Sequence, residues 1–287
     1  MIRFVVAKDI DRIKYDRCIN NSIGHRIYAT SWYLDCTCDR WDLIVKGDYE
    51  VVMPLPNRKK YGIPYVYMPA WIQQLGLFSS EEITEDLIDS FIATIPRKIQ
   101  WIDYQFNSMN KFSGNNISFR KNYLLPMDEA FEAIIQKSNK NRKRIFKKGF
   151  GDCVLDKQGD SEVFLTHYKT MQKSFSLSNT AIDNLRNLCE SKNRHVQVWN
   201  VFKEGAFVGG LIWLKDMHRI TYLVPFADEL GKKMDIPSYI IYELIQEFQQ
   251  QKLVLDFEGS MLPGVEKFYQ SFGAEPEVYS YFRKRPF

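Results

Sequence analysis

Apolar and polar side chains alternate along residues 253–258, and this pattern predicts a short β-strand with two unlike faces. One face is apolar, whereas the other carries the carboxylates of Asp256 and Glu258. Gly259 and Ser260 then break the strand, because glycine and serine favour turns. Two carboxylates on one strand face shift each other's pKa, so the end of this strand is a candidate site of proton transfer. A polar sheet edge or a structural ion pair explains the same residues equally well.

A helix is predicted directly after this strand. Val265, Phe268, Tyr269 and Phe272 recur at the i, i+3, i+4, i+7 spacing of an amphipathic helix. Gly273 follows at the position where a helix C-cap is expected. Tyr269 is therefore either a packed aromatic residue of the core or a proton donor with an ordinary pKa of about 10.

The same two periodicities continue along the rest of the chain and alternate between strand and helix. Strands are predicted at residues 1–8, 43–45, 49–55, 65–69, 101–106, 117–125, 195–203, 206–215 and 219–224. Helices are predicted at residues 9–20, 31–38, 81–95, 161–175, 180–191 and 238–250. This mixture predicts an α/β protein.

Two helix-to-strand junctions resemble each other. Residues 90–107 read SFIATIPRKIQWIDYQFN and residues 243–260 read ELIQEFQQQKLVLDFEGS, so that Asp103 lines up with Asp256. The two junctions lie about one domain length apart, so the match indicates either a diverged tandem duplication or a chance similarity. The expected division is an N-terminal domain at 1–135, a basic linker helix at 136–150 and a C-terminal domain at 151–287.

Composition sets the broad class of the protein. The 287 residues are 45% apolar, which is enough to bury a core, and the net charge of +4 neither demands nor excludes an anionic partner. The five cysteines form no CxxC pair and the four histidines are scattered, so we expect neither a disulfide framework nor a metal site. No apolar run approaches about 18 residues, so no membrane span is expected. A reduced cytoplasm fits best, and the oligomeric state stays open between monomer and homodimer.

Residues 137–148, KSNKNRKRIFKK, hold seven basic and no acidic side chains. Such a segment attracts phosphate, from RNA, from a nucleotide-linked sugar precursor or from an anionic bilayer, and Arg142, Lys143 and Arg144 are its candidate contacts. A solvated linker helix is the alternative. Phe146 is the one aromatic residue among them, so sequence-specific nucleic-acid binding is not expected.

The segment FYQSFG at residues 268–273 resembles the F-Y-x-x-x-G signature late in the GNAT acyltransferase fold. The wider stretch from LDFEGS to SFGAEP is similar to the C-terminal part of Fem-type transferases, which are double-GNAT proteins, and PAWIQQLGLFS at residues 69–79 also resembles them. The resemblance implies an α+β fold of two tandem GNAT-like domains, each with a mixed, mostly antiparallel sheet flanked by helices. It also implies that Tyr269 protonates the leaving thiolate of coenzyme A.

In GNAT proteins the pyrophosphate of coenzyme A lies on backbone amides between a strand and a helix, which corresponds here to residues 226–239. The resemblance makes Gly231, Lys232, Lys233 and Ser238 candidate cofactor-binding residues. An ordinary loop at a helix start is the alternative for this segment.

The resemblance implies an N-acyltransferase that moves an acyl or aminoacyl group from acyl-CoA or aminoacyl-tRNA to an amine. Glu258 or Asp256 would position or deprotonate the amine, Tyr269 would protonate the leaving group, and Ser260 would donate to a substrate oxygen. One alternative is tRNA-dependent aminoacyl transfer to a bacterial cell-wall precursor. Another is a non-catalytic module that binds an anionic glycan or a nucleotide sugar.

Overall fold

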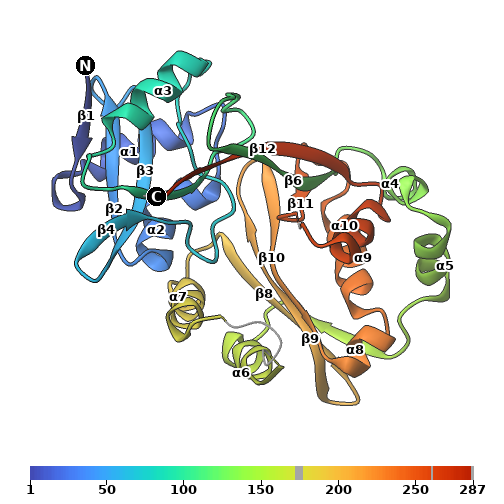
Figure 1. Cartoon of the computed structure of the whole chain (residues 1–287). Coiled ribbons are helices and arrows are strands. Elements are labelled where there is room, and N and C mark those ends of the chain that lie inside the picture. Colours follow the sequence, from blue (N-terminus) through green and yellow to red (C-terminus); the bar gives the residue numbers. More distant parts are fainter. Residues whose placement is uncertain (172–176, 260, 286–287) are drawn as a thin grey trace. The chain divides into compact units, whose positions relative to one another are not determined.

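The computed structural model describes residues 1–171, 177–259 and 261–285 (Figure 1). The chain forms two compact units. Unit 1 contains residues 1–120 together with the C-terminal residues from Val278, and unit 2 contains residues 121–277. The predicted alternation of strands and helices is present in both units, so the α/β class is confirmed.

Unit 1 is a sheet with the strand order β1-β2-β3-β4-β5-β12. Its strands are β1 (Ile2–Val5), β2 (Trp41–Lys46), β3 (Val51–Lys60), β4 (Ile63–Val66), β5 (Trp101–Gln105) and the C-terminal part of β12 (Glu275–Lys284). Its helices are α1 (Arg12–Asn20), α2 (Ser31–Thr37) and α3 (Glu85–Thr94). The pair β4 and β5 is parallel, whereas the other neighbours within the unit are antiparallel.

Unit 2 has the strand order β6-β11-β10-β9-β8-β7. Its strands are β6 (Ile117–Pro126, mostly in this unit), β7 (Cys153–Asp156), β8 (Val196–Lys203), β9 (Ala206–Lys215), β10 (Arg219–Ala227) and β11 (Val254–Asp256). Its helices are α4 (Phe131–Lys137), α5 (Lys140–Lys148), α6 (Ser161–Met171), α7 (Asn179–Glu190), α8 (Glu229–Lys233), α9 (Ile236–Phe248) and α10 (Pro263–Gln270). Here β10 and β11 form the parallel pair.

The two junctions that resemble each other in sequence take the same place in their units. In unit 1, Val66 of β4 lies opposite Ile102 of β5, and in unit 2, Ile220 of β10 lies opposite Leu255 of β11, both in parallel register. In both β5 and β11 the next residue is an aspartate, Asp103 and Asp256 respectively. The two junctions thus share a parallel register in their units.

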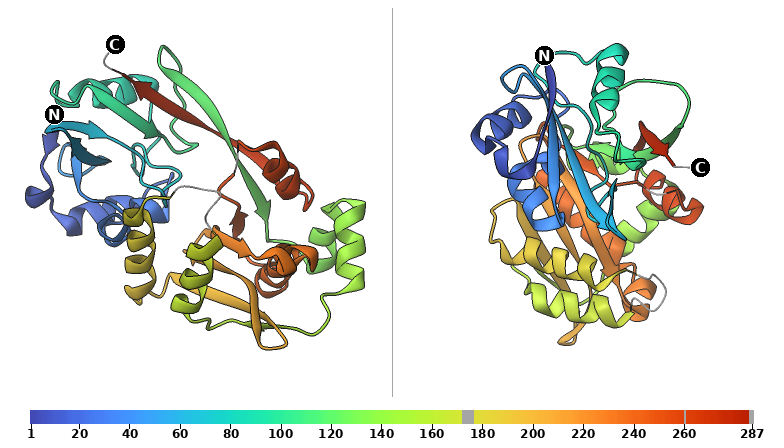
Figure 2. Two further views of the ribbon diagram at one scale, coloured as in Figure 1. Left: turned by 60° about the horizontal axis from the view of Figure 1, so that its bottom comes forward. Right: turned by 60° about the vertical axis from the view of Figure 1, so that its left-hand side comes forward.

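The antiparallel neighbours of these two strands come from unexpected parts of the chain. In unit 1, β5 pairs with the C-terminal strand β12, which is dark red in Figure 2, so that Tyr104 lies opposite Phe282. In unit 2, β11 pairs with β6, which follows β5 in sequence, so that Leu255 lies opposite Leu125. The compact units therefore do not coincide with the expected division into 1–135, 136–150 and 151–287, which stays a prediction about separately folding domains.

Several element boundaries differ from the predicted ones. The helix expected from Asp9 begins only at Arg12, because Asp11 is its N-cap and accepts a hydrogen bond from the backbone N–H of Lys14 at 3.1 Å. The helix expected from residue 81 begins at Glu85, where the Thr84 hydroxyl caps the first turn. The strand expected at 253–258 ends at Asp256. Helix α10 ends at Gln270 with Ser271 as its C-cap, two residues before the predicted cap Gly273.

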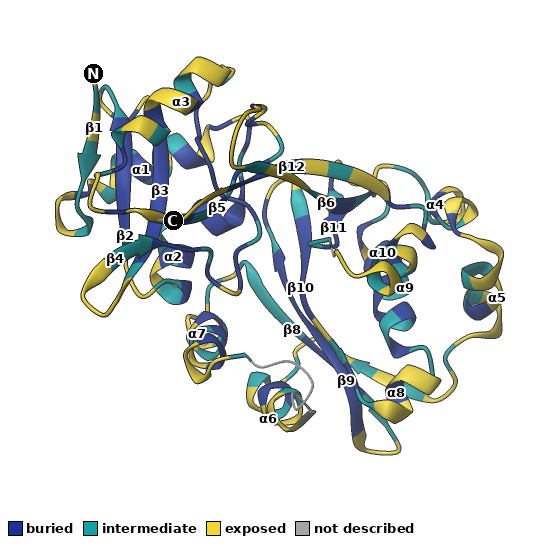
Figure 3. Ribbon diagram, viewed as in Figure 1, coloured by how far each residue is buried: buried dark blue, intermediate teal, exposed yellow. Residues whose placement is uncertain are grey.

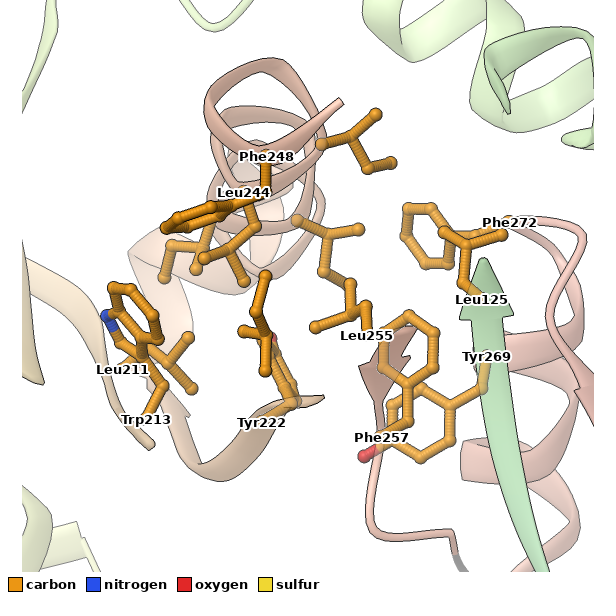
Figure 4. Packing of buried hydrophobic residues seen from close by; sticks show 14 of the residues in the cluster. Leu125, Leu211, Trp213, Tyr222, Leu244, Phe248, Leu255, Phe257, Tyr269 and Phe272 are labelled. Atoms are coloured by element: carbon orange, nitrogen blue, oxygen red, sulfur yellow. The ribbon is translucent and has the colours of Figure 1, made fainter. Parts of the chain in front are cut away.

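The core of unit 2 lies where α9 and α10 pack on the sheet. Leu244 and Phe248 of α9 contact the β9 and β10 side chains in a buried cluster, and Leu255, Phe257 and Phe272 extend it toward α10 (Figure 4). Figure 3 shows the same arrangement, with the central strands buried and the outer helix faces exposed. Burial of such large apolar side chains fixes the end of β11 in place, since removing one of them costs about 2–5 kcal/mol.

Candidate functional site

Asp256, the last residue of β11, is 1% exposed, and both of its carboxylate oxygens accept hydrogen bonds. Its Oδ2 accepts a hydrogen bond from the guanidinium of Arg219 at 2.6 Å. Its Oδ1 accepts one from the side-chain amide of Asn122 at 2.8 Å and one from the backbone N–H of Glu258 at 2.9 Å. The structure therefore gives Asp256 the geometry of a buried, charge-paired anchor.

Arg219, at the start of β10, joins this carboxylate to a second one. Its other terminal nitrogen donates to Oε1 of Glu277 at 2.9 Å, and Asn122 donates to Oε2 of Glu277 at 3.1 Å. Burial alone would lower the pKa of Arg219, but the charges of Asp256 and Glu277 outweigh burial and raise it. The four side chains form one network that holds the ends of β6, β10, β11 and the start of β12 together. We call it the Arg219 network.

Glu258 does not lie on the strand face that the sequence predicts for it. It has a φ of +57°, in the left-handed region, and Gly259 follows with a φ of +55°. A Cβ atom on Gly259 would lie 2.2 Å from the backbone oxygen of Lys121, so only glycine fits there. The chain therefore turns sharply after β11, and this turn leaves the half-buried Glu258 carboxylate near the phenol of Tyr269. Ser260, the predicted donor to a substrate oxygen, lies outside the described residues.

Tyr269 of α10 is 7% exposed and stacks on Phe257 with the ring centres 4.6 Å apart (Figure 4). Burial, followed by the charges of Glu258 and Asp256, raises the pKa of Tyr269 well above its ordinary value. The phenol therefore keeps its proton throughout the physiological pH range. Asp256 and Glu258 thus lie close enough to Tyr269 to interact with its phenol electrostatically.

Two further tyrosines, which the sequence reading missed, contribute to the same cluster. Tyr222 of β10 has its ring centre 6.4 Å from that of Tyr269, and its buried hydroxyl has no hydrogen-bond partner among the described residues. Tyr123 of β6 donates a short hydrogen bond to Glu266 of α10, and burial together with Glu266 raises the pKa of Tyr123 to about 12. Both lie on strands next to β11, so sequence could have indicated them only once the strand order was known.

The loop predicted to hold a phosphate is already occupied by a carboxylate. Asp228 is the N-cap of α8 and accepts a hydrogen bond from the backbone N–H of Gly231 at 2.6 Å. A Cβ atom on Gly231 would lie 2.0 Å from the backbone oxygen of Val208, so this glycine allows α8 to pack closely on β9. Lys232 pairs with Glu229 at 2.7 Å on the surface, and Lys233 is exposed. An added phosphate would meet the negative charge of Asp228 at this helix start.

Ser238 and Arg142, predicted to bind cofactor and substrate respectively, bind each other. A terminal nitrogen of Arg142 donates to the Ser238 hydroxyl at 2.6 Å, and its Nε donates to the Ser271 hydroxyl at 2.8 Å. The guanidinium also lies 4.5 Å from the ring centre of Phe268, and burial lowers the pKa of Arg142. Arg142 thus fastens α5 to α9 and α10.

The other two predicted contacts of the basic segment lie nearer the surface of α5. Lys143 donates to Gln136 at 3.0 Å and Arg144 donates to Asn141 at 3.1 Å. Arg144 is exposed, as are Lys140, Lys147 and Lys148, and these four positions recur at helical spacing on one side of α5. The basic segment therefore combines one buried clamp, Arg142, with an exposed cationic side.

Two classes of feature are absent from the described residues. No group of three or more His, Cys, Asp or Glu side chains is arranged there to hold a metal ion. No helix in the described ranges is long and apolar enough to cross a bilayer.

No family model matches the chain, and no curated protein matches it. Solved structures do match its fold. FemX superposes with a TM-score of 0.67 at 9% identity over 95% of this chain and 96% of FemX. A tandem GNAT protein from the clavulanic acid biosynthesis pathway gives a TM-score of 0.55 at 8% identity, with all of both chains covered.

A third match extends this set. The C-terminal domain of a putative lysylphosphatidylglycerol synthetase from Agrobacterium fabrum gives a TM-score of 0.52 at 8% identity over 94% of this chain and 91% of that domain. The chain thus has the fold of the Fem-like double-GNAT proteins, as its C-terminal motif predicts. At such low identity the matches establish the fold alone.

Proposed function

We propose that this protein is an N-acyltransferase, which moves an acyl or aminoacyl group from an ester or thioester donor to an amine. One observation carries the proposal: within a double-GNAT fold, the buried phenol of Tyr269 and the half-buried carboxylate of Glu258 are close enough near the end of β11 to interact electrostatically. At that point β10 and β11 stop pairing, since their parallel register ends with Thr221 opposite Asp256, and β10 continues with β9 as its one paired neighbour among the described strands. A bulge in β10 between Thr221 and Val224 marks the same place.

In the proposed reaction Glu258 and Tyr269 each transfer one proton. The amine nitrogen attacks the carbonyl carbon of the donor, so that a C–N bond forms and the C–O or C–S bond to the leaving group breaks. Glu258 takes the proton that the nitrogen loses, and Tyr269 gives its phenolic proton to the leaving atom. The proton on Glu258 then returns to the Tyr269 phenolate, which restores both groups for the next turnover.

Asp256 has a positioning role in this scheme. Its carboxylate is buried and accepts hydrogen bonds from Arg219, Asn122 and the Glu258 backbone, so taking up a proton would weaken its pairing with the Arg219 guanidinium. The bond to the Glu258 N–H fixes the turn that presents the neighbouring carboxylate. The Arg219 network therefore supports the base without acting as one.

Two features favour an oxygen ester over acyl-CoA as the donor. A thiolate leaves as a weak base with a conjugate pKa of about 8.5, so a phenol of raised pKa gives it a proton reluctantly. An alkoxide is almost as basic as hydroxide, whose conjugate acid has a pKa of about 15.7, and takes that proton readily. The Asp228 carboxylate at the start of α8 also opposes a coenzyme A pyrophosphate there. An aminoacyl ester of a nucleoside, as at the end of aminoacyl-tRNA, suits both features.

The exposed cationic side of α5 supports an acceptor or donor that carries phosphate. Lys143 and Arg144 would contact it, together with Lys140, Lys147 and Lys148. The alternatives of a cell-wall precursor and of RNA share this chemistry, and both would bind less tightly as salt rises.

Thermal unfolding with donor analogues tests the proposal. Acetyl-CoA, a long-chain acyl-CoA and puromycin, a stable aminoacyl-nucleoside amide, are each added near millimolar concentration. A ligand at about 100 times its dissociation constant stabilises the folded state by roughly 2.7 kcal/mol, which raises the melting temperature clearly. We expect puromycin to raise it. A rise with acyl-CoA alone would overturn the ester assignment, and no rise with any donor would count against acyl transfer.

A further inference from the structure

A β-hairpin extends from the sheet of unit 1. The register of β3 with β2 ends at Pro56, which lies opposite Trp41, and β4 pairs with β5 only from Tyr65 onward. Between these points β3 and β4 pair with each other, with Lys60 opposite Ile63. Residues 59–64 therefore form a two-stranded ribbon with neither β2 nor β5 paired beside it (Figure 1). We call residues 59–64 the hairpin tip.

Two apolar side chains of the hairpin tip are turned to solvent. Tyr61 is 93% exposed and Ile63 is 61% exposed, and the whole turn beside β4 is coloured as exposed in Figure 3. Apolar surface gains free energy when it leaves water, and a ribbon beyond the sheet has no core against which to bury it. The exposed pair is therefore available to an apolar environment outside the chain.

The conformation of the turn does not favour a tyrosine. Tyr61 has a φ of +51° and Gly62 a φ of +79°, and two central residues with positive φ are typical of a type I′ turn. Asparagine followed by glycine is the preferred sequence for that turn, whereas a bulky residue with positive φ is uncommon. Folding of the hairpin thus gives no reason for an exposed aromatic ring at position 61, which points to a role in binding.

Two cations lie beside these apolar side chains. Lys59 and Lys60 are exposed, point to opposite sides of the ribbon and form no ion pair in the part of the chain that the structure describes. The ammonium group of Lys60 lies 5.8 Å from the ring centre of Tyr61. No acidic residue occurs in the sequence between Glu50 and Glu81. The hairpin tip therefore combines an aromatic and an aliphatic side chain with two uncompensated positive charges.

From these observations we propose that the hairpin tip binds the surface of a bilayer that contains anionic lipids. The ring of Tyr61 lies among the head groups, where an amphipathic aromatic side chain is most stable, and Ile63 reaches the acyl boundary. Lys59 and Lys60 contact the lipid phosphates on the two sides of the ribbon. Lysines on a projecting ribbon also prevent strand pairing between molecules, but that role does not require Tyr61 and Ile63 to be exposed.

Single-stranded RNA fits the hairpin tip less well than a bilayer does. RNA would use the two lysines and the ring of Tyr61, but the exposed aliphatic side chain of Ile63 has no π-face on which a base could stack. The hairpin tip contains none of the residues assigned to acyl transfer. The proposal therefore holds or fails independently of that reaction.

Sedimentation of the whole protein with lipid vesicles tests the proposal. Vesicles of equal parts phosphatidylglycerol and phosphatidylcholine are compared with vesicles of phosphatidylcholine alone. We expect the protein to bind the anionic vesicles at least about fivefold more tightly, and this binding to weaken as salt rises. No binding to the anionic vesicles, or equal binding to both kinds, would overturn the proposal.

Matched variants separate the hairpin tip from the rest of the surface, including the cationic side of α5. Tyr61→Asn with Ile63→Thr removes the apolar side chains without changing the charge, and it creates the preferred sequence of the turn. We therefore expect an equal or higher melting temperature and at least about fivefold weaker binding to anionic vesicles. The control, Ile13→Gln with Met217→Gln, removes apolar side chains that are 76% and 74% exposed elsewhere, and should change binding less than about twofold. Equal effects of the two pairs would overturn the assigned surface.

A second pair of variants tests the charges. Lys59→Gln with Lys60→Gln is compared with Lys8→Gln with Lys98→Gln, which removes the same charge at exposed positions outside the hairpin tip. We expect the hairpin variant to bind anionic vesicles at least about threefold more weakly than the control. Polyuridylate is the nucleic-acid probe. If the changes in the hairpin tip weaken binding of polyuridylate and leave vesicle binding unchanged, the hairpin tip contacts RNA and the proposal is wrong.

Discussion

At the scale of single residues, Asp256 and Glu258 looked equivalent in the sequence and are not equivalent in the fold. The alternation of residues 253–258 predicted that both carboxylates lie on one strand face. It could not predict that the strand ends at Asp256, because the close approach of Gly259 to the Lys121 backbone depends on a distant strand. Nor could it indicate Arg219 as the partner of Asp256, since the two lie on strands whose pairing is long-range.

This difference predicts opposite outcomes for two similar substitutions. Asp256→Asn leaves the buried guanidinium of Arg219 with less compensation and should lower the free energy of unfolding by about 3 kcal/mol. Glu258→Gln should leave stability within about 0.5 kcal/mol of wild type and slow acyl transfer about 100-fold. Denaturant unfolding and initial rates check both. Asp89→Asn, at an exposed helix position, is the control, and equal stability of the two site variants would contradict the assigned roles.

The raised pKa of Tyr269 predicts a specific dependence of stability on pH. Below pH 10.0, the ordinary pKa of the phenol, neither the folded nor the unfolded state ionises it. Above that pH the unfolded chain loses the proton while the folded state keeps it, so stability falls by up to about 1.4 kcal/mol per pH unit for this group. Tyr269→Phe removes this loss. We expect the unfolding free energies of wild type and variant to converge or cross between pH 10 and 11, and parallel curves would contradict the burial of the phenol.

At the scale of elements, the strongly periodic segments were predicted well and the others were not. Helix α9 and strands β8, β9 and β10 were identified from their apolar patterns, with ends wrong by a few residues. Strand β12 was missed because Tyr279, Ser280, Tyr281 and Phe282 are all buried, so no alternation marks it. Burial on both faces is a property of the assembled sheet, which one segment cannot reveal.

The basic segment was predicted as one patch. In the structure its side chains lie on two sides of α5: Arg142 contacts α9 and α10, whereas Arg144 is exposed. Arg142→Ala removes two hydrogen bonds to buried or half-buried hydroxyls and the contact with Phe268, so we expect a loss of about 1–3 kcal/mol in unfolding free energy. Arg144→Ala, two residues further on, should change stability by less than about 0.5 kcal/mol. Chemical denaturation distinguishes them. Equal stability of the two variants would show that Arg142 does not fasten α5.

At the scale of the whole molecule, the fold class followed from one short motif, but the division of the chain did not. The motif at residues 268–273 predicted a double-GNAT fold, which the likeness to FemX confirms. The sequence predicted a linker at residues 136–150, which puts β6 (residues 117–126) in the N-terminal domain. In the structure β6 pairs with β11. Sequence could not show this, because the antiparallel partner of each central strand comes from the other half of the sequence.

Fragments of the chain test these units. The fragment 121–277 contains β6 and β11 together, so we expect it to unfold cooperatively on heating. The fragment 151–287 lacks β6 and leaves the edge of β11 unpaired, so we expect no cooperative transition. Circular dichroism with thermal unfolding checks both. The reverse result would support the division at residue 150 and contradict the compact units.

The central claim is that unit 2 transfers an acyl group with Tyr269 as proton donor. The most direct measurement is the rate of amide formation from an aminoacyl-adenosine ester and a panel of primary amines, followed by mass spectrometry. Wild type is compared with Tyr269→Phe and with a control, Tyr242→Phe. The control removes the phenol of a tyrosine on α9 whose ring packs against Phe131. The account predicts amide product, a rate about 10- to 100-fold lower for Tyr269→Phe and an unchanged rate for Tyr242→Phe. Equal rates in all three proteins, or no amide with any amine, would contradict it.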